Sequence, residues 1–239
     1  FFVNAGVRFV EEMAKMRAFV QLWDEVTRER YGVTDPAQRR FRYGVQVNSL
    51  GLTEAQPENN VQRIVLEMLA VTLSRDARAR AIQLPAWNEA LGLPRPWDQQ
   101  WSLRMQQVLA FESDLLEYED IFDGSKVIEG RTAELRDAAW AEFEEVMSLG
   151  GAFNAVDELK GRLVRSMAER TRRIESGEQV VVGVNSYTES EDSPLAVPGN
   201  ILVVDPAVEN EMIADVAAWR SSRDNARVQA ALARVRAAA

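Results

Sequence analysis

Residues 79–94, ARAIQLPAWNEALGLP, form the stretch that decides the fold. Ala79–Leu84 has the apolar character of a short buried strand, Pro85 breaks it, and the following turn opens a helix that carries Glu89. A strand that passes through a polar turn into a helix is the repeating unit of a parallel α/β fold. Phe41–Asn48, FRYGVQVN, predicts a second strand of the same kind.

Two strand–helix units therefore follow one another in the chain. Phe41–Asn48 leads through a polar loop into Val61–Ser74, where apolar residues recur at helical spacing. Consecutive units of this kind imply parallel strands with right-handed crossovers. Two or three strands cannot close an eight-stranded barrel, so they form either part of one or a small open sheet. The apolar start, Phe1-Phe2-Val3, could be the end of a strand or a loop, and it favours a fragment of a longer chain.

The rest of the chain is predicted to be mainly helical. Long helices are expected from Gly6 to near Arg30, from Trp97 to about Tyr118, over Thr132–Leu149, over Ala152–Ser176, and from Val208 to the end. The Asp123-Gly124 pair predicts a short hairpin, or a loop plus an edge strand, within Ile121–Glu129. Val180–Val184 predicts a last buried strand. Ser186–Asn200 is polar and contains two prolines, which is typical of a linker.

Composition excludes several classes of function. The 239 residues carry a net charge of −9, which argues against non-specific binding to nucleic acid or to an anionic membrane. Cysteine and histidine are absent, so thiolate chemistry and Ser–His or Cys–His pairs are absent as well. No metal-ligand spacing is present, and we predict no metal site. No apolar run is long enough to span a bilayer, so the cytoplasm is the expected location.

Polar residues gather at the ends of the two predicted strands. Arg42, Gly44 and Gln46 stand at a spacing of two and would share one face of their strand. In a barrel that face is the interior, where an arginine and a glutamine need polar partners or a ligand. The set continues with Ser49 on the first loop and with Gln83, Pro85 and Glu89 on the second unit. These residues indicate either a binding site or a polar network inside the barrel.

Several segments resemble the adenosylcobalamin-dependent acyl-CoA mutases. They are FFVNAGVRFVEEMAKMRA from Phe1, QVNSLGLTEAQPENN from Gln46, NEALGLP from Asn88 and GEQVVVGVN from Gly177. RRFRYGVQVNSLGLTE, ARAIQLPAWNEALGLPRPWDQQWSLRMQQ and LLEYEDIFDG are most similar to the ethylmalonyl-CoA mutase branch. The resemblance covers nearly the whole chain. It implies an isomerase, an intramolecular transferase that uses adenosylcobalamin (coenzyme B12) to rearrange a branched acyl-CoA by radical chemistry.

The resemblance also implies a domain organisation. Residues 1–185 would be the C-terminal part of an acyl-CoA-binding (β/α)8 TIM barrel with parallel strands. Residues 186–239 would be an extended linker and a terminal helix that lead towards a cobalamin-binding domain absent from this chain. The partners implied are the acyl-CoA substrate and the remainder of the mutase chain or a separate cobalamin-binding domain, and a homodimer is compatible with this. The fragment alone is expected to be inactive.

Individual positions take their roles from the same resemblance. The implied catalytic residues are Gln46 and Glu89. The implied cofactor-binding residues are Gln46, Ser49, Leu50, Glu89, Ala90 and Leu93. The implied substrate-binding residues are Phe2, Arg42, Gly44, Gln83 and Pro85.

The sequence departs from methylmalonyl-CoA mutases at several of these positions. Those enzymes have histidine at the positions of Gly44 and Gln83 and asparagine at that of Pro85, so methylmalonyl-CoA is not the expected substrate. Loss of an imidazole at Gly44 opens room for an ethyl branch, which favours conversion of ethylmalonyl-CoA to methylsuccinyl-CoA. Two alternatives are a mutase acting on another acyl-CoA, such as methylmalonyl-CoA, and a non-catalytic barrel subunit. A third is an α/β barrel that binds some other phosphorylated ligand.

Overall fold

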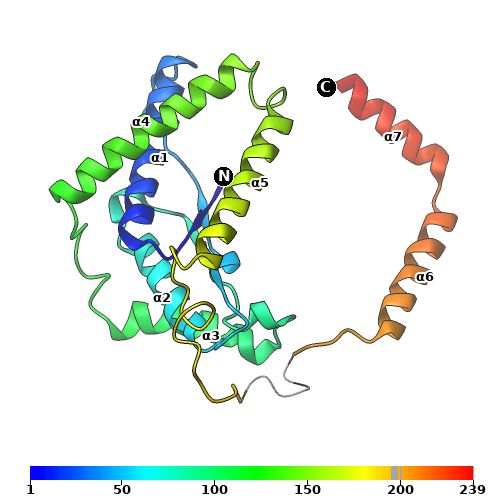
Figure 1. Cartoon of the computed structure of the whole chain (residues 1–239). Coiled ribbons are helices and arrows are strands. Elements are labelled where there is room, and N and C mark those ends of the chain that lie inside the picture. Colours follow the sequence, from blue (N-terminus) through cyan, green and yellow to red (C-terminus); the bar gives the residue numbers. More distant parts are fainter. Residues whose placement is uncertain (195–198, 200, 239) are drawn as a thin grey trace. The chain divides into compact units, whose positions relative to one another are not determined.

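The computed structural model describes residues 1–194, 199 and 201–238. These residues fall into two compact units, Phe1–Ile201 and Leu202–Ala239, and each is described by itself (Figure 1).

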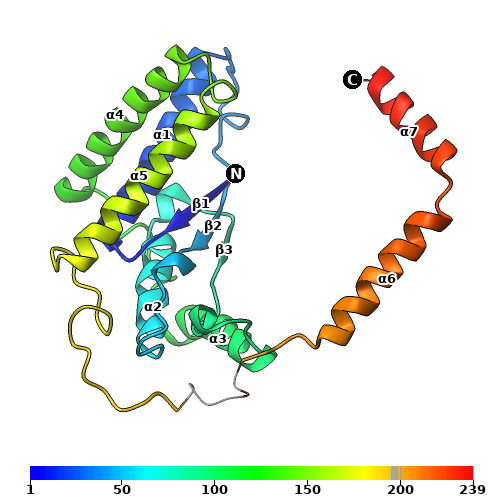
Figure 2. The same cartoon turned by 45° about the vertical axis from the view of Figure 1, so that its right-hand side comes forward.

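The first unit contains a parallel sheet of three strands (Figure 2). The strands are β1 (Phe2–Ala5), β2 (Gly44–Val47) and β3 (Ala81–Gln83), in the order β1-β2-β3. Helix α1 (Phe9–Glu29) connects the first pair and α2 (Asn59–Thr72) connects the second. The predicted α/β class and parallel strands are confirmed, and the apolar start of the chain forms a strand. This sheet is compatible with part of a barrel.

The strands are shorter than Phe41–Asn48 and Ala79–Leu84 predict. Single backbone bonds continue the pairing beyond them: Gly44 donates to the carbonyl of Phe1, and Arg80 donates to that of Tyr43. A full ladder requires neighbouring strands of matching length, and β1 and β3 are themselves short.

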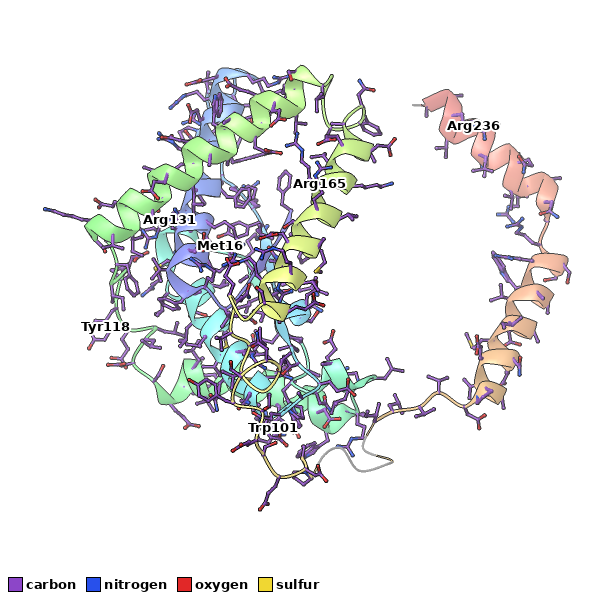
Figure 3. The ribbon with its side chains drawn as sticks, viewed as in Figure 1. Met16, Trp101, Tyr118, Arg131, Arg165 and Arg236 are labelled. Carbon is purple, nitrogen blue, oxygen red and sulfur yellow. The ribbon has the colours of Figure 1, made fainter. Side chains whose placement is uncertain are left out.

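One face of the sheet carries the core. Val45 and Val47 stand at a spacing of two and are fully buried, which is the alternation expected of a strand. Met16 of α1 packs with Val45, whereas Ile64 and Met68 of α2 pack with Val47 (Figure 3 labels Met16). The buried apolar residues of both helices therefore face the sheet, and the sheet's other face is left for the site.

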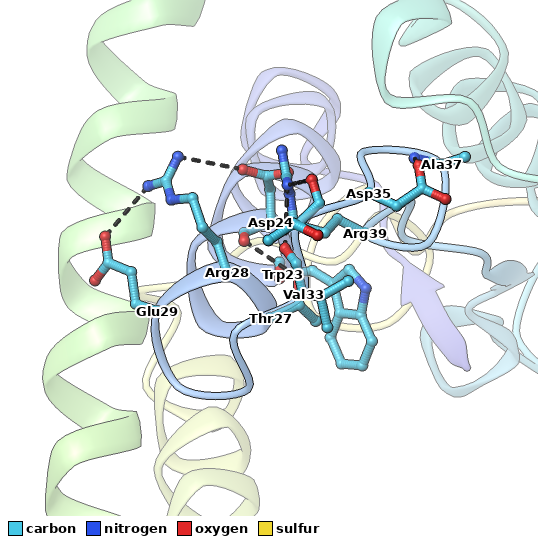
Figure 4. A network of polar contacts seen from close by, with 10 residues as sticks. Trp23, Asp24, Thr27, Arg28, Glu29, Val33, Asp35, Ala37 and Arg39 are labelled. Carbon is cyan, nitrogen blue, oxygen red and sulfur yellow. Dashed lines mark hydrogen bonds and ion pairs between the residues drawn. The ribbon is translucent and has the colours of Figure 1, made fainter.

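The remaining elements of this unit are helices and turns. They are the short 3-10 helices η1 (Ser49–Gly51), η2 (Arg75–Ala77) and η3 (Glu89–Leu91), and the α-helices α3 (Pro96–Glu112), α4 (Lys126–Ser148) and α5 (Val156–Glu175). Helix α4 lies along α1, and Arg131 of α4 pairs with Glu11 of α1 at 2.7 Å. Arg39 anchors the loop before β2 by binding Asp24 of α1 at 2.7 Å (Figure 4).

Four further predicted elements are wrong or too long. The helix expected to reach Tyr118 ends at Glu112, where Ser113 donates its hydroxyl back to the carbonyl of Leu109. The hairpin over Ile121–Glu129 is absent from the described chain: the Asp123-Gly124 turn leads instead into α4. Ser125 begins that helix by accepting a hydrogen bond from the amide of Ile128, so the turn serves a helix start rather than a pair of strands.

The predicted strand Val180–Val184 is a turn. Asn185 closes it by accepting from the amide of Val181 and donating to the carbonyls of Ile174 and Gln179, all at 2.7 Å. Gly183, at a φ of 83°, adopts the left-handed conformation that lets its amide reach the carbonyl of Ser186. A strand requires backbone hydrogen bonds to a neighbouring strand. Here the side chain of Asn185 supplies hydrogen bonds to the backbone instead.

The predicted terminal helix is two helices, α6 (Pro206–Ser222) and α7 (Asn225–Ala238). The break falls at Arg223, which is extended, and at Asp224, whose carboxylate accepts from the amide of Arg227. An aspartate at that position starts a new helix better than it continues an old one. The predicted linker, 186–200, lies partly outside the described residues. Across the described part of the chain, none of the helices has the length and apolar character that crossing a membrane requires.

Candidate functional site

The strand register brings the predicted site residues Phe2, Gly44, Gln46 and Gln83 together in two rows. Asn4, Gln46 and Gln83 are direct partners across β1, β2 and β3, and Phe2, Gly44 and Ala81 form the preceding row. Partners in a parallel sheet project from the same face. Val45 and Val47 project into the core, so both rows lie on the opposite face, where Gln46 and Gln83 are exposed. The predicted neighbourhood of the two strand ends is therefore present.

A hollow of about 310 Å³ opens at the carboxyl ends of β1 and β2. Its lining residues are Phe2, Val3, Asn4, Gln46, Val47, Asn48, Ser49 and Leu50. Four of these, Phe2, Gln46, Ser49 and Leu50, are predicted site residues. The hollow combines amide and hydroxyl groups with exposed apolar surface, since Leu50 is 72% exposed. Such a mixture of a few polar groups with apolar surface is typical of a site that orients part of a ligand.

Gly44 makes a close approach possible between β2 and the ring of Phe2. A Cβ atom at position 44 would lie 3.0 Å from Cε1 of Phe2, which is tighter than normal contact. The Phe2 side chain is 79% exposed, so the ring has open space into which it can move. The absence of a side chain at Gly44 thus determines where Phe2 lies and how much room remains above the sheet.

The loop after β2 is held by local hydrogen bonds. The side chain of Asn48 accepts from the amide of Leu50 at 3.1 Å, and Leu52 donates to the carbonyl of Ser49. This is the arrangement of an asparagine that caps a short helix, here η1. It fixes Ser49 and Leu50 at the rim of the hollow.

The loop after β3 is buried at its base and exposed at its tip. Pro85 is buried and its carbonyl accepts from the Ser102 hydroxyl of α3 at 2.8 Å, so its contacts are internal. Glu89, Ala90 and Leu93 are exposed. They lie on or next to η3 and are not among the residues that line the hollow.

Arg42 lies apart from the strand-end residues. It belongs to the coil before β2, at the opposite end of the strand from Gln46, and it donates a long 3.4 Å hydrogen bond to the carbonyl of Ala37. The expectation that Arg42, Gly44 and Gln46 share one strand face is therefore wrong for Arg42, because β2 begins only at Gly44.

A buried carboxyl group lies beneath the loop after β2. Glu67 of α2 is 2% exposed, and a Cβ atom on Gly51 would lie 3.8 Å from its Oε1. Its Oε2 has no hydrogen-bond partner among the described residues. Burial raises the pKa of Glu67 to about 8, Glu12 of α1 adds to the rise by repulsion, and Arg63 opposes it. Glu67 is therefore mostly protonated at neutral pH.

Three residues near the site were missed by sequence reasoning: Asn4, Asn60 and Glu67. Asn4 could have been found, because it follows Phe2 at the strand spacing of two. Asn60 and Glu67 carry no such signal, since polar residues on an amphipathic helix are usually exposed to solvent. Within the described ranges, no group of three or more acidic, histidine or cysteine side chains could hold a metal ion.

Comparison with known proteins decides the family. The family model described as methylmalonyl-CoA mutase matches residues 1–239. The chain belongs to the methylmalonyl-CoA mutase family. Within this family it is 65% identical to ethylmalonyl-CoA mutase of Cereibacter sphaeroides, over all of this chain and 37% of that protein. It is 63% identical to ethylmalonyl-CoA mutase of Methylorubrum extorquens, over all of this chain and 35% of that protein.

A methylmalonyl-CoA mutase of Cereibacter sphaeroides is more distant. It is 34% identical, over 97% of this chain and 32% of that protein. The chain thus spans about a third of the length of the curated relatives that it matches. The resemblance inferred from the sequence segments is confirmed at the level of the family, and the named ethylmalonyl-CoA mutases are nearer than this methylmalonyl-CoA mutase.

Proposed function

We propose that the whole protein to which this chain belongs is a coenzyme B12-dependent isomerase that converts ethylmalonyl-CoA to methylsuccinyl-CoA. The observation that carries this proposal is the difference in identity. Two proteins named ethylmalonyl-CoA mutase match at 65% and 63% over the full chain, against 34% for a methylmalonyl-CoA mutase. This chain would supply part of the acyl-CoA site, and the remainder of the mutase would supply the rest.

Gly44 supports the choice of substrate. The space above β2 at this position is bounded by the movable ring of Phe2 and lacks any side chain from residue 44 itself. An ethyl branch is one methylene larger than a methyl branch, and one methylene contributes about 1–3 kcal/mol to discrimination in a fitted pocket. Phe2, Gly44 and Gln83 are the proposed contacts of the acyl-CoA, together with Arg42 at the far end of the strand and Pro85 beyond β3.

Adenosylcobalamin would be held by residues of the hollow at the carboxyl ends of β1 and β2 and by the exposed tip of the loop after β3. The hollow offers the neutral polar groups of Gln46 and Ser49 and the exposed apolar side chain of Leu50. Exposed Glu89 would hold the ribose of the cofactor, with Ala90 and Leu93 beside it. When bound, the cofactor supplies the radical that starts the rearrangement. The chain's own residues orient the two ligands and keep water from them.

The sheet supports a proposal for the fold of the whole protein. Both β1 and β3 are edge strands of the described sheet, and the polar rows of the sheet project from its uncovered face. A (β/α)8 TIM barrel would pair both edges with further strands and enclose that face. Residues 1–185 would then be the C-terminal part of the barrel, and residues 186–239 would lead towards a cobalamin-binding domain. We propose a cytoplasmic enzyme.

Turnover by the full-length protein tests the function. With adenosylcobalamin present, kcat/KM for ethylmalonyl-CoA is expected to exceed that for methylmalonyl-CoA by at least about tenfold, as one methylene allows. A preference for methylmalonyl-CoA would overturn the substrate. Binding of an acyl-CoA without turnover of either thioester would instead favour a non-catalytic barrel subunit.

The role of Glu89 is tested separately. In the full-length enzyme, Glu89→Ala is expected to weaken adenosylcobalamin binding about tenfold or more, because a charged hydrogen-bond partner is lost. Equilibrium titration followed by absorbance measures the dissociation constant. The exposed carboxylate Glu112, at the end of α3 and outside the proposed site, provides a matched control, Glu112→Ala, which is expected to bind normally. Equal affinity of wild type and Glu89→Ala would remove Glu89 from the site.

A further inference from the structure

Asn60 connects the two loops that carry the proposed cofactor residues. It lies in the first turn of α2 and is fully buried. Its side-chain nitrogen donates to the carbonyl of Thr53, in the loop after β2, and to the carbonyl of Trp87, in the loop after β3, each at 2.9 Å. One side chain thus binds the backbone of both loops.

The hydrogen-bonding capacity of Asn60 is fully used. Its oxygen accepts from the amide of Thr53 at 3.0 Å and from Nη1 of Arg63 at 2.7 Å, while its nitrogen makes the two donations. An asparagine side chain offers two donor hydrogens and one oxygen with two lone pairs, so every site has a partner. Such a saturated buried amide has one orientation, and it holds its partners in place.

These bonds reach the exposed tips of both loops by short paths. Trp87 precedes Glu89 by two residues, and the amide of Glu89 donates to the carbonyl of Ala86 at 3.0 Å. On the other side, Thr53 follows the η1 turn that carries Leu50. Asn60 therefore links the two halves of the proposed cofactor site through a single side chain.

We infer that Asn60 is a positioning residue that sets the loop after β3 against the loop after β2. The placement of the two loops by Asn60 is argued from hydrogen bonds alone. The expected effect on catalysis rests in addition on the proposed function. Asn60 is fully buried and its side chain binds protein groups, so we assign it no contact with substrate or cofactor. Loss of the hydrogen bond from Asn60 to the carbonyl of Trp87 would misplace Glu89. A misplacement of about 1 Å can lower a catalytic rate about 10²-fold.

Asn60→Asp in the full-length protein tests the inference. Aspartate keeps the shape and both acceptor contacts, to Thr53 and Arg63, but it removes the donations to the carbonyls of Thr53 and Trp87. In the cofactor-free protein, amide hydrogen exchange across residues 86–92 is expected to accelerate about tenfold or more. In the loaded enzyme, kcat is expected to fall about 10²-fold, with KM for the acyl-CoA changed less than about threefold.

Asn59→Ala is the matched control. Asn59 is adjacent in α2, and its side chain donates only within the loop after β2, to Oε1 of Gln56 at 2.9 Å. Exchange across residues 86–92 is expected to be unchanged in this variant. If Asn60→Asp fails to fold, Asn60→Ser keeps a hydroxyl near Thr53 but is too short to reach Trp87, and the same measurements apply.

The possible outcomes separate the two proposals. Unchanged exchange at 86–92 in folded Asn60→Asp would overturn the positioning role, whatever the enzyme does. Failure of both variants to fold would make Asn60 a residue of stability alone and would also overturn that role. Faster exchange in Asn60→Asp, together with a wild-type protein that shows no adenosylcobalamin-dependent turnover, would retain the positioning role of Asn60 and refute the proposed function.

Discussion

Gly44 occupies the position at which adding a side chain has the most direct effect on the proposed substrate pocket. Its absent Cβ leaves the ring of Phe2 against the backbone of β2. Because Phe2 is largely exposed, the ring can be displaced at small cost to the fold. A larger residue at position 44 would therefore change the pocket while leaving the sheet intact.

The first prediction follows from this geometry. Gly44→His is expected to reduce the preference for ethylmalonyl-CoA over methylmalonyl-CoA by about 10- to 200-fold, the range for one methylene in a filled pocket. The ratio of kcat/KM for the two thioesters measures it in the full-length enzyme. Gly44→Ala, which adds only the Cβ atom, should give a smaller change of the same sign. Unchanged selectivity in Gly44→His would contradict the role of this position.

Glu67 gives a prediction about pH. Its pKa is raised from 4.5 to about 8, so the folded protein keeps the proton while the unfolded chain has lost it. Its contribution to stability is therefore greatest below about pH 4.5 and is lost as the pH rises towards about 8. Glu67→Gln is neutral at every pH. The melting temperature of the variant minus that of wild type is expected to increase up to about pH 8 and then level off.

Thermal melts of full-length wild type and Glu67→Gln across this range measure the difference. Subtraction cancels the titration of the other groups, which both proteins share. A difference independent of pH would show that Glu67 ionises normally and is not buried against Glu12.

At the scale of elements, Asp120 fixes the segment between α3 and α4. Its carboxylate accepts from Arg17 of α1 at 2.6 Å, from the amide of Asp76 at 3.0 Å and from the amide of Phe122 at 3.0 Å. Burial alone would raise its pKa, but these three hydrogen bonds together lower the pKa below its ordinary value of 3.8. The pair is buried, since the Arg17 and Asp120 side chains are 14% and 2% exposed.

Asp120→Ala is expected to lower the free energy of unfolding by about 3 kcal/mol near neutral pH, because it leaves Arg17 buried without its partner. Chemical denaturation of the full-length protein measures the loss. Arg136→Ala removes an exposed pair with Asp137 and should cause no measurable change. Acid should reduce the difference in unfolding free energy between wild type and Asp120→Ala. The contribution of the aspartate to stability is lost as the pH falls below 3.8. A loss of unfolding free energy in Asp120→Ala as small as that in Arg136→Ala would contradict the stabilising role of Asp120.

The elements differ in how well their sequences predict them. The α1 and α2 stripes and the strand centres at Val45 and Ile82 were predictable because burial imposes a repeat on them. The hairpin at Ile121–Glu129 and the strand at Val180–Val184 were not, because side chains override the local pattern there. Ser125 caps a helix and Asn185 closes a turn. The role of Asn60 was also not predictable from the sequence, because one of its partners, the carbonyl of Trp87, lies 27 residues away along the chain.

At the scale of the molecule, the polar rows across β1, β2 and β3 are the central feature. Their positions followed from the sequence once parallel pairing was inferred, because Gln46 and Gln83 stand at corresponding strand ends. Arg42 did not join them, because its strand begins two residues later. The predicted role of each residue in binding ligand remains a prediction of the family resemblance.

The most direct test is amide hydrogen exchange of the full-length protein, alone and with ethylmalonyl-CoA and adenosylcobalamin together. Exchange is expected to slow by about tenfold or more in the loops at residues 48–52 and 86–92, because both would be covered by ligand. The exposed helix α5 is expected to be unaffected and serves as the internal control. Unchanged exchange in both loops, at ligand concentrations that saturate the enzyme, would contradict the account.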